Sequence, residues 1–361
     1  MTQAKESSAP AATQTAGTLV MRPGRRGDQE GLFRLAKAAG PGMTNLQPDL
    51  DLLAEKLVAT EAALLAEDFR ARGVPIFFVL ERVDAAGVAE GDAIVGTACI
   101  FPHIGVEWPF YSYRLTRQAQ THKALGKTVA HELLIPANDF DGQAEVGGLF
   151  VDPSVRGVAA GRLAARSRYL FLAEHRDWFG RQVISDLRGY QDESGVSPVW
   201  EALGREFYGM DFADADRMNA IHGNQFIADL SPKHPIYVNL MPRAAREALG
   251  RPHNQGRRAM ALLIEEGFRY ENYVDIFDGG PTMCANIDDL KAVRDSRKIR
   301  VARIAEGVGG ANQLVSAGAG GAFRAARGGL VVDGGGAAQL DRALARALGV
   351  EVGDEVRHVG F

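Results

Sequence analysis

The sequence has few cysteines and no long apolar run. Its two cysteines, Cys99 and Cys284, lie far apart in the chain, so they form neither a metal-ligand spacing nor a disulfide framework. We therefore expect two reduced thiols in a core and no bound metal. No stretch approaches the roughly 18 uninterrupted apolar residues that a membrane-spanning helix requires. The composition thus favours a globular protein whose fold does not depend on disulfide bonds or a bound metal.

Neither sign of charge is in large excess. The net charge of -4 over 361 residues gives no electrostatic reason to expect nucleic acid or an anionic membrane as a partner. Residues 1–17 are small and polar, with neither the apolar segment of a secretory signal nor the arginines of a transit peptide. We therefore predict a disordered tail at 1–17, a cytoplasmic location and small-molecule substrates.

Two common catalytic and cofactor-binding motifs are also missing. No G-x-S-x-G nucleophile motif occurs, and Cys99 has no histidine partner near it in the sequence, so covalent catalysis has no support. Eleven of the residues from 307 to 336 are glycine. They lack the preceding strand, and the acidic residue about 20 positions later, that a dinucleotide-binding loop requires. The sequence predicts no permanently bound cofactor.

Apolar periodicity after the tail predicts alternating strands and helices. Asp28 is placed to act near the N-terminus of the first helix. The predicted elements, in chain order, are strand 18–23, helices 26–40 and 48–69, a hairpin of strands 74–83 and 92–101, strands 108–117 and 125–136 that continue the sheet, a strand-to-helix stretch at 147–175, strand 181–189, helix 197–207 and strand 208–212. From residue 300, brief strands surround one helix in which Leu340, Leu344 and Leu348 are spaced i, i+4, i+8.

The stretch GGLFVDPSVRGVAAGRLAARSRYLFLAEH, residues 147–175, ends an apolar strand and begins a long helix. Unpaired N–H groups and the helix dipole both favour negative charge at a helix N-terminus. The junction therefore predicts an anion site, and pyrophosphate is its natural occupant.

The loop in that stretch resembles a known phosphate loop. RGVAAG, Arg156 to Gly161, is similar to the R/Q-x-x-G-x-G/A loop of the GNAT acyl-CoA N-acyltransferases, with Ala159 where that superfamily usually has glycine. LVMRPGRRGDQEGLFRLA resembles its first strand and helix. DESGVSPVW, SPKHPIYV, EEGFRYENYVDIFDGGPT and GMTNL resemble signature stretches of arginine N-succinyltransferase. By these stretches the chain is identified as a member of the arginine N-succinyltransferase family.

The resemblance implies an α+β fold with a GNAT-like mixed, mostly antiparallel sheet flanked by helices, and a small β-rich C-terminal domain. It implies transfer of a succinyl group from the cosubstrate succinyl-CoA to the α-amine of L-arginine, giving N2-succinyl-L-arginine and CoA as the first step of arginine catabolism. The predicted division is a tail at 1–17, an acyl-CoA-binding domain at 18–212, a second α/β part at 213–290 that completes the active site, and the C-terminal domain at 291–361.

The resemblance also implies site residues. Leu149 contacts the acyl-CoA through its main chain with Val151 beside it, and Arg156 to Gly161 receive the pyrophosphate. His234, held between Pro232 and Pro235, is assigned as the proton donor, a role that an imidazole can fill near neutral pH.

The sequence is compatible with several alternatives. The guanidinium could be bound by Asp275 and Asp278 or by Asp192 and Glu193, and the succinyl carboxylate by Arg114 or Arg188, because such groups form charge-assisted pairs. The acceptor could be arginine or ornithine, and the enzyme a homo- or hetero-oligomer. A non-catalytic acyl-CoA-binding subunit, or an acyltransferase with another donor or acceptor, also fits the sequence.

Overall fold

The computed structural model describes residues 17–40, 43, 45–65, 73–155, 159–212, 214–215, 218, 225–309 and 312–361. Apart from Gly17, the tail predicted at 1–17 lies outside these residues. None of the described helices has the length and apolar content to cross a membrane. Both cysteines are buried and unpaired, as the sequence predicted.

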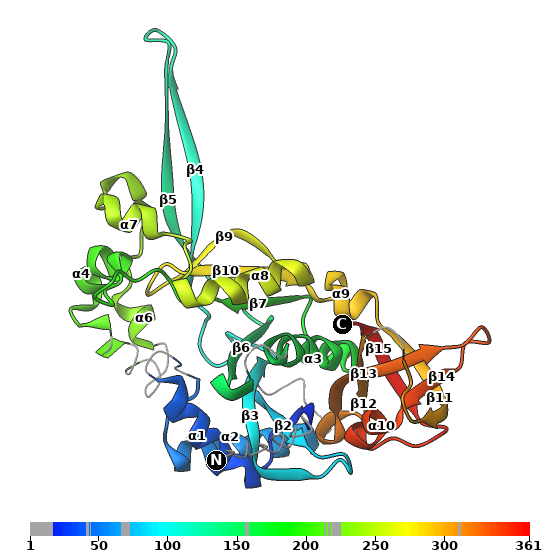
Figure 1. Cartoon of the computed structure of the whole chain (residues 1–361). Coiled ribbons are helices and arrows are strands. Elements are labelled where there is room, and N and C mark those ends of the chain that lie inside the picture. Colours follow the sequence, from blue (N-terminus) through cyan, green and yellow to red (C-terminus); the bar gives the residue numbers. More distant parts are fainter. Residues whose placement is uncertain are drawn as a thin grey trace, which may run out of the picture.

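The described strands form one continuous sheet with the order β12-β15-β11-β14-β13-β1-β2-β3-β6-β7-β10-β9-β4-β5-β8 (Figure 1). Most neighbouring strands run antiparallel, whereas β6 with β7 and β11 with β14 run parallel. The strands are β1 (Thr18–Pro23), β2 (Ile76–Val83), β3 (Ala89–Phe101), β4 (Ser112–His122), β5 (Lys127–Ala137), β6 (Ala144–Val151), β7 (Gln182–Asp186), β8 (Ile236–Tyr237), β9 (Arg269–Asp275), β10 (Pro281–Asn286), β11 (Arg297–Ala305), β12 (Asn312–Ala317), β13 (Arg324–Val332), β14 (Ala338–Asp341) and β15 (Glu355–Gly360).

Helices cover both faces of the sheet because successive strand side chains point to opposite sides. On β2, Phe77 and Val79 pack with the apolar residues of α1 and α2, whereas Phe78 and Leu80 pack with those of α3. The helices are α1 (Gln29–Ala39), α2 (Leu50–Leu65), α3 (Ala160–Glu174), α4 (Arg205–Tyr208), α6 (Gln225–Leu230), α7 (Arg243–Ala248), α8 (Arg257–Glu266), α9 (Lys291–Arg294) and α10 (Arg342–Leu348).

The C-terminal strands close into a small barrel. β12 pairs with both β13 and β15, so β11 to β15 form a ring that joins the rest of the sheet where β13 pairs with β1. Leu340, Leu344 and Leu348 are all buried, but only the last two lie on a helix. Leu340 belongs to β14, because the Asp341 side chain accepts a hydrogen bond from the Ala343 N–H at 2.9 Å and so begins α10 there.

The predicted fold class is confirmed: a mixed, mostly antiparallel sheet is flanked by helices and followed by a β-rich C-terminal part. The sheet crosses the predicted boundary at 212/213, because β10 pairs with β7 along its length. The division at 212/213 and 290/291 stays a prediction. Residues 208–212, expected as a strand, contain none: Tyr208 ends α4, and its C-cap Gly209 has a φ of 64°.

The strands β4 and β5 form an arm that stands away from the body of the molecule (Figure 1). They pair with each other over their full length, from Ser112↔Ala137 to His122↔Lys127. Only the base of the arm joins the sheet, through residues 112–114 with β9 and 133–134 with β8. The expected continuation of the sheet by these two strands therefore occurs at the base alone.

Candidate functional site

A bulge interrupts β6 just before the predicted phosphate loop. Cys99 of β3 pairs with Gly147, and Thr97 pairs with Phe150, so Ala98 alone faces two residues of β6. Gly148 has a φ of 59°, and a Cβ there would lie 2.8 Å from the Cys99 sulfur. Because a bulge leaves an extra residue out of the ladder, the main chain at Gly148 and its neighbour is not fully used by β3.

The other edge of β6 parts from its neighbour at the same place. β6 and β7 pair only at Ala144↔Val183 and Glu145↔Ile184, although β6 runs on to Val151. The two strands diverge beyond Glu145, which opens the sheet beside the bulge.

The helix α3 begins a few residues beyond the bulge. Its N-cap, Ala159, has a φ of 60°, a left-handed conformation that costs a residue with a Cβ about 1–2 kcal/mol. This explains why glycine is usual at that position. Among the described residues no side chain caps the helix, so the first-turn N–H groups, which include that of Gly161, are available to an anion.

The structure brings three of the predicted binding residues together. The half-buried side chains of Leu149 and Val151 pack against the core beneath α3, which leaves contact with a ligand to the main chain. Gly161 lies in the first turn of α3. Arg156 lies outside the described residues.

His234 lies elsewhere in the sheet. It sits on a bend between Pro232 and Pro235, and its side chain is exposed. The strand β8, which follows it, pairs with β5, and five strands separate β8 from β6 in the sheet order. The Ser231 and Tyr208 hydroxyls, 2.5 Å apart, fasten the start of this segment beside α4. The predicted proton donor and the predicted CoA loop therefore belong to different parts of the sheet.

Two carboxylates hold the turn between β9 and β10. Oδ1 of Asp275 accepts hydrogen bonds from the N–H groups of Phe277 and Asp278 at 2.8 and 2.9 Å. Asp278 accepts from the N–H groups of Gly189 and Gly280 at 2.7 and 2.9 Å. Both carboxylates are thus engaged with backbone donors, which gives them a structural role beside any contact with a guanidinium.

Two further carboxylates face the point where β6 and β7 diverge. Glu145 is the β6 residue of the last pair with β7, and Asp186 is two residues beyond its partner Ile184, so both side chains project from one face. The Thr282 hydroxyl donates a hydrogen bond to Asp186. In the part of the chain that the structure describes, the Glu145 side chain has no hydrogen bond or ion pair.

Burial, together with mutual repulsion, favours the protonated form of the carboxyl groups in this acidic group. Burial and the charge of Asp275 raise the pKa of Glu145 to about 7. Burial, with the charges of Glu145 and Asp275, raises the pKa of Asp186 well above its ordinary value, and burial with Asp275 raises that of Asp278 to about 8. A carboxyl group with a pKa near 7 can exchange a proton at neutral pH.

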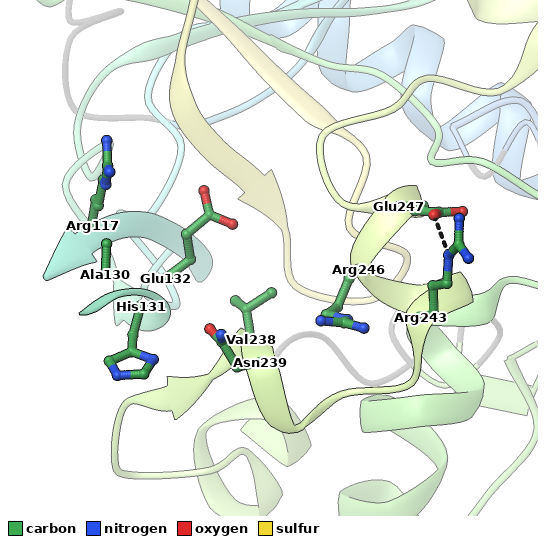
Figure 2. A pocket seen from close by; sticks show the side chains of 9 residues that line it. All are labelled: Arg117, Ala130, His131, Glu132, Val238, Asn239, Arg243, Arg246 and Glu247. Atoms are coloured by element: carbon green, nitrogen blue, oxygen red, sulfur yellow. Dashed lines mark hydrogen bonds and ion pairs between the residues drawn. The ribbon is translucent and has the colours of Figure 1, made fainter. Parts of the chain in front are cut away.

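A cavity of about 570 Å³ lies at the foot of the β4–β5 arm (Figure 2). Arg243 and Glu247, one turn apart on α7, form an ion pair of 2.7 Å at its rim. Arg117 and Arg246 have no ion pair among the described residues. The lining residues are Arg117, Ala130, His131, Glu132, Val238, Asn239, Arg243, Arg246 and Glu247. The cavity therefore belongs to the β8 side of the molecule and is separate from the β6–α3 junction.

The remaining sequence candidates lie outside the junction. Asp192 is exposed and accepts hydrogen bonds from the N–H groups of its own turn, and Glu193 and Arg188 are exposed. The Arg114 guanidinium stacks over the Tyr273 ring at 5.3 Å. Sequence reasoning missed the bulge and Glu145, although the glycine pair inside a predicted strand was a signal for the bulge.

The chain is similar to known proteins over most of its length. A family model described as "Arginine N-succinyltransferase beta subunit" matches residues 19–292, and a second, described as its C-terminal domain, matches 297–360. Proteins called "Arginine N-succinyltransferase" from Enterobacter sp. (strain 638) and Escherichia coli (strain K12 / DH10B) are each 38% identical over 287 residues, 79% of this chain and 80% of theirs. The structure of arginine/ornithine succinyltransferase subunit AI from Pseudomonas aeruginosa superposes with a TM-score of 0.83 at 34% identity, and covers 95% of this chain and 99% of that chain.

Proposed function

The chain belongs to the arginine N-succinyltransferase family of acyltransferases, and on that premise we propose that it transfers the succinyl group of succinyl-CoA to the α-amine of L-arginine at the β6–α3 junction. Three features that lie within one short segment support this placement. The bulge at Gly148, the divergence of β6 from β7, and the uncapped N-terminus of α3 follow one another along the chain.

The donor binds along this segment. The pyrophosphate of CoA meets the loop from Arg156 to Gly161, because first-turn amides and the helix dipole both attract negative charge. The pantetheine arm then lies in the opening between β6 and β7, with the thioester against the main chain of Leu149 beside Val151. Main-chain N–H groups directed at the thioester oxygen stabilise the negative charge that develops there during amide formation.

The acceptor approaches the face that carries Glu145 and Asp186. Arginine and ornithine both bear positive charge, and carboxylates are the groups that bind it by charge-assisted hydrogen bonds. Glu145 faces the divergence of the strands without a protein partner among the described residues. The acidic group thus supports a cationic acceptor better than a neutral one.

Three proton movements accompany the reaction. The α-ammonium loses a proton to solvent, the neutral nitrogen bonds to the thioester carbon, and the carbon–sulfur bond breaks. The nitrogen also releases a second proton to solvent, so that an amide and CoA thiolate form. We assign His234 as the acid that gives the thiolate its proton. Because its segment belongs to the β8 side of the sheet, this role requires the His234 imidazole and the CoA sulfur at the bulge to come within hydrogen-bond reach in the complex.

A thiol-release assay tests the proposed function. We expect CoA to be released from succinyl-CoA in the presence of L-arginine, with N2-succinyl-L-arginine as the product identified by mass spectrometry. Ornithine, lysine and agmatine as alternative acceptors, and acetyl-CoA as an alternative donor, define the specificity. Measurable CoA binding without any CoA release from succinyl-CoA would contradict catalysis and support a binding subunit.

A charge at Gly161 tests the position of the pyrophosphate. A Cβ at this residue would meet no other atom within 4 Å, so Gly161→Glu can fold without a clash. We expect CoA to bind about 5- to 10-fold more weakly, because a carboxylate near the phosphates adds roughly 1 kcal/mol of repulsion or more. Isothermal titration measures the affinity. Gly161→Gln is the control of equal size, and equal affinities for the two variants would remove the pyrophosphate from this loop.

A further inference from the structure

A lysine on α2 reaches the face of the sheet that lies under the bulge. Lys56 lies among Leu53, Leu57 and Thr60, three of the buried residues of that helix, so it occupies the apolar side. Its Nζ donates a hydrogen bond to the Asn45 carbonyl oxygen at 3.2 Å and lies 5.5 Å from the centre of the Phe77 ring. A charged group on the buried side of a helix needs an explanation, because the hydrophobic pattern alone would place an apolar residue there.

The Lys56 ammonium lacks an anionic partner. Within the described residues, no carboxylate lies at ion-pair distance from it. The charge of Asp49 raises the pKa of Lys56 without a direct contact between the two side chains. Its Oδ1 instead accepts a hydrogen bond from the Leu52 N–H at 3.0 Å. Burial lowers the pKa of Lys56, an effect that the charge of Asp49 opposes only in part. Buried charges are normally paired, so this half-buried cation is suited to an anionic group of a ligand.

The surroundings of Lys56 converge on the bulge of β6. Phe77, whose ring lies beside the Lys56 Nζ, pairs with Cys99 of β3, and Cys99 in turn pairs with Gly147. The Nδ2 atom of Asn45 lies 3.7 Å from the position that a Cβ on Gly147 would occupy, and Oε1 of Glu145 lies 3.5 Å from it. A cation, an amide and a carboxylate therefore gather around a strand position that has no side chain.

We propose that Lys56, assisted by Asn45, binds the free carboxylate of the succinyl group and so selects the acyl donor. This inference rests on the proposed function, which places the thioester against the main chain next to Gly148. The succinyl group carries a carboxylate two methylenes beyond its thioester carbonyl. Lys56 and Asn45 reach the bulge from the α1–α2 face, opposite α3, where an acyl chain can extend without crossing the pyrophosphate site.

Donor specificity follows from this contact. Butyryl-CoA has an acyl chain of the same length but ends in a methyl group, so it cannot form the charge-assisted hydrogen bond with Lys56. A neutral acyl group would also leave the ammonium desolvated and unpaired. The wild-type protein should therefore prefer succinyl-CoA to butyryl-CoA, and the preference should depend on the cation at position 56.

The test compares kcat/KM for succinyl-CoA and butyryl-CoA in Lys56→Met and in the wild-type protein. We expect Lys56→Met to lose about 10- to 100-fold in kcat/KM with succinyl-CoA, because a hydrogen bond between charged groups is removed. Its kcat/KM with butyryl-CoA should stay the same or rise. Lys56→Arg keeps a cation and should retain most of the preference for succinyl-CoA.

Lys37→Met is the matched control. Lys37 also lies over an aromatic ring, 4.1 Å from the centre of Phe33, but it is exposed on α1 and should leave both donors unaffected. The affinity for CoA without an acyl group verifies that each variant is folded, and Lys56→Gln replaces Lys56→Met if the latter is not. If the wild-type protein releases CoA from succinyl-CoA and Lys56→Met keeps the wild-type ratio between donors, Lys56 does not bind the carboxylate. Absence of wild-type turnover with succinyl-CoA would instead overturn the proposed function.

Discussion

His234→Gln should lower kcat by about 10²- to 10⁴-fold and leave the affinity for CoA nearly unchanged, because a positioned general acid contributes a factor of that size. The exposed position of His234 between Pro232 and Pro235 means that glutamine can replace it without disturbing a core. Glutamine can still form a hydrogen bond, but it cannot deliver a proton to the CoA thiolate near neutral pH. Steady-state rates of CoA release, together with titration of CoA, measure the two quantities.

His122→Gln is a suitable control for this experiment. His122 is exposed at the end of β4, where its Nδ1 accepts a hydrogen bond from the Leu125 N–H at 3.1 Å, far along the arm from the base. Its replacement should leave kcat unaltered. If the His234→Gln protein keeps a rate within about threefold of wild type, well short of the range for a general acid, His234 has only a structural role in its turn. The thiolate then takes its proton from another group.

Arg22→Met should lower the free energy of unfolding by about 3–5 kcal/mol, because it removes the cation that two buried carboxylates share and leaves Glu81 with only a longer contact of 3.8 Å to Arg324. The guanidinium of Arg22 donates to Glu81 at 2.8 and 3.0 Å and to Asp28 at 2.8 and 2.9 Å. All three side chains are at most 10% exposed. This group joins β1, β2 and the turn that leads into α1, so its loss should loosen the sheet on which α1 and α2 rest. Denaturant-induced unfolding measures the change.

An exposed ion pair provides the comparison for Arg22. Arg243 pairs with Glu247 on α7, but the two side chains are 82% and 60% exposed. Arg243→Met should therefore leave the denaturation midpoint where it is, since water solvates the remaining carboxylate. If Arg22→Met is as stable as Arg243→Met, the buried group adds nothing to the stability of the sheet.

The local elements of the fold could be predicted from sequence because their patterns are strong. The hairpin of β2 and β3 and the strand-to-helix junction at β6 and α3 follow from apolar runs with clear turns between them. The role of Asp28 could be predicted only in part. It precedes α1 as expected, but its carboxylate is bound by Arg22 and by the Arg25 N–H instead of capping the helix. No local pattern signals such a contact, since Arg22 lies in a strand.

Pairings between distant segments could not be predicted from the sequence. The segments at 197–212 and 257–275 both show a helix, a glycine and an aromatic run, yet only the second supplies a strand, β9, to the sheet. The outcome depends on β10, which pairs with β7 and so offers an edge to β9. Likewise, the alternation in β4 and β5 predicted strands, but alternation cannot show that the outer arm has no sheet beside it.

The part of the site that is formed by main-chain groups could be predicted from the sequence. The part that is formed by side chains from distant segments could not. The loop that ends at Gly161 was recognisable because a helix N-terminus is local in sequence. Lys56 and Glu145 were missed because each is an ordinary charged residue until α2, β3 and β6 bring them to the bulge. A charged residue among the apolar positions of α2 was the available signal for Lys56.

A crystal structure of the protein with CoA bound tests the central claim most directly. The account predicts the pyrophosphate at the N–H groups that begin α3, the pantetheine arm between β6 and β7, and the sulfur beside the bulge at Gly148. The cavity at the foot of the arm is the alternative, since Arg117 and Arg246 there could bind phosphate (Figure 2). Nucleotide density in that cavity, with none at α3, would contradict the account.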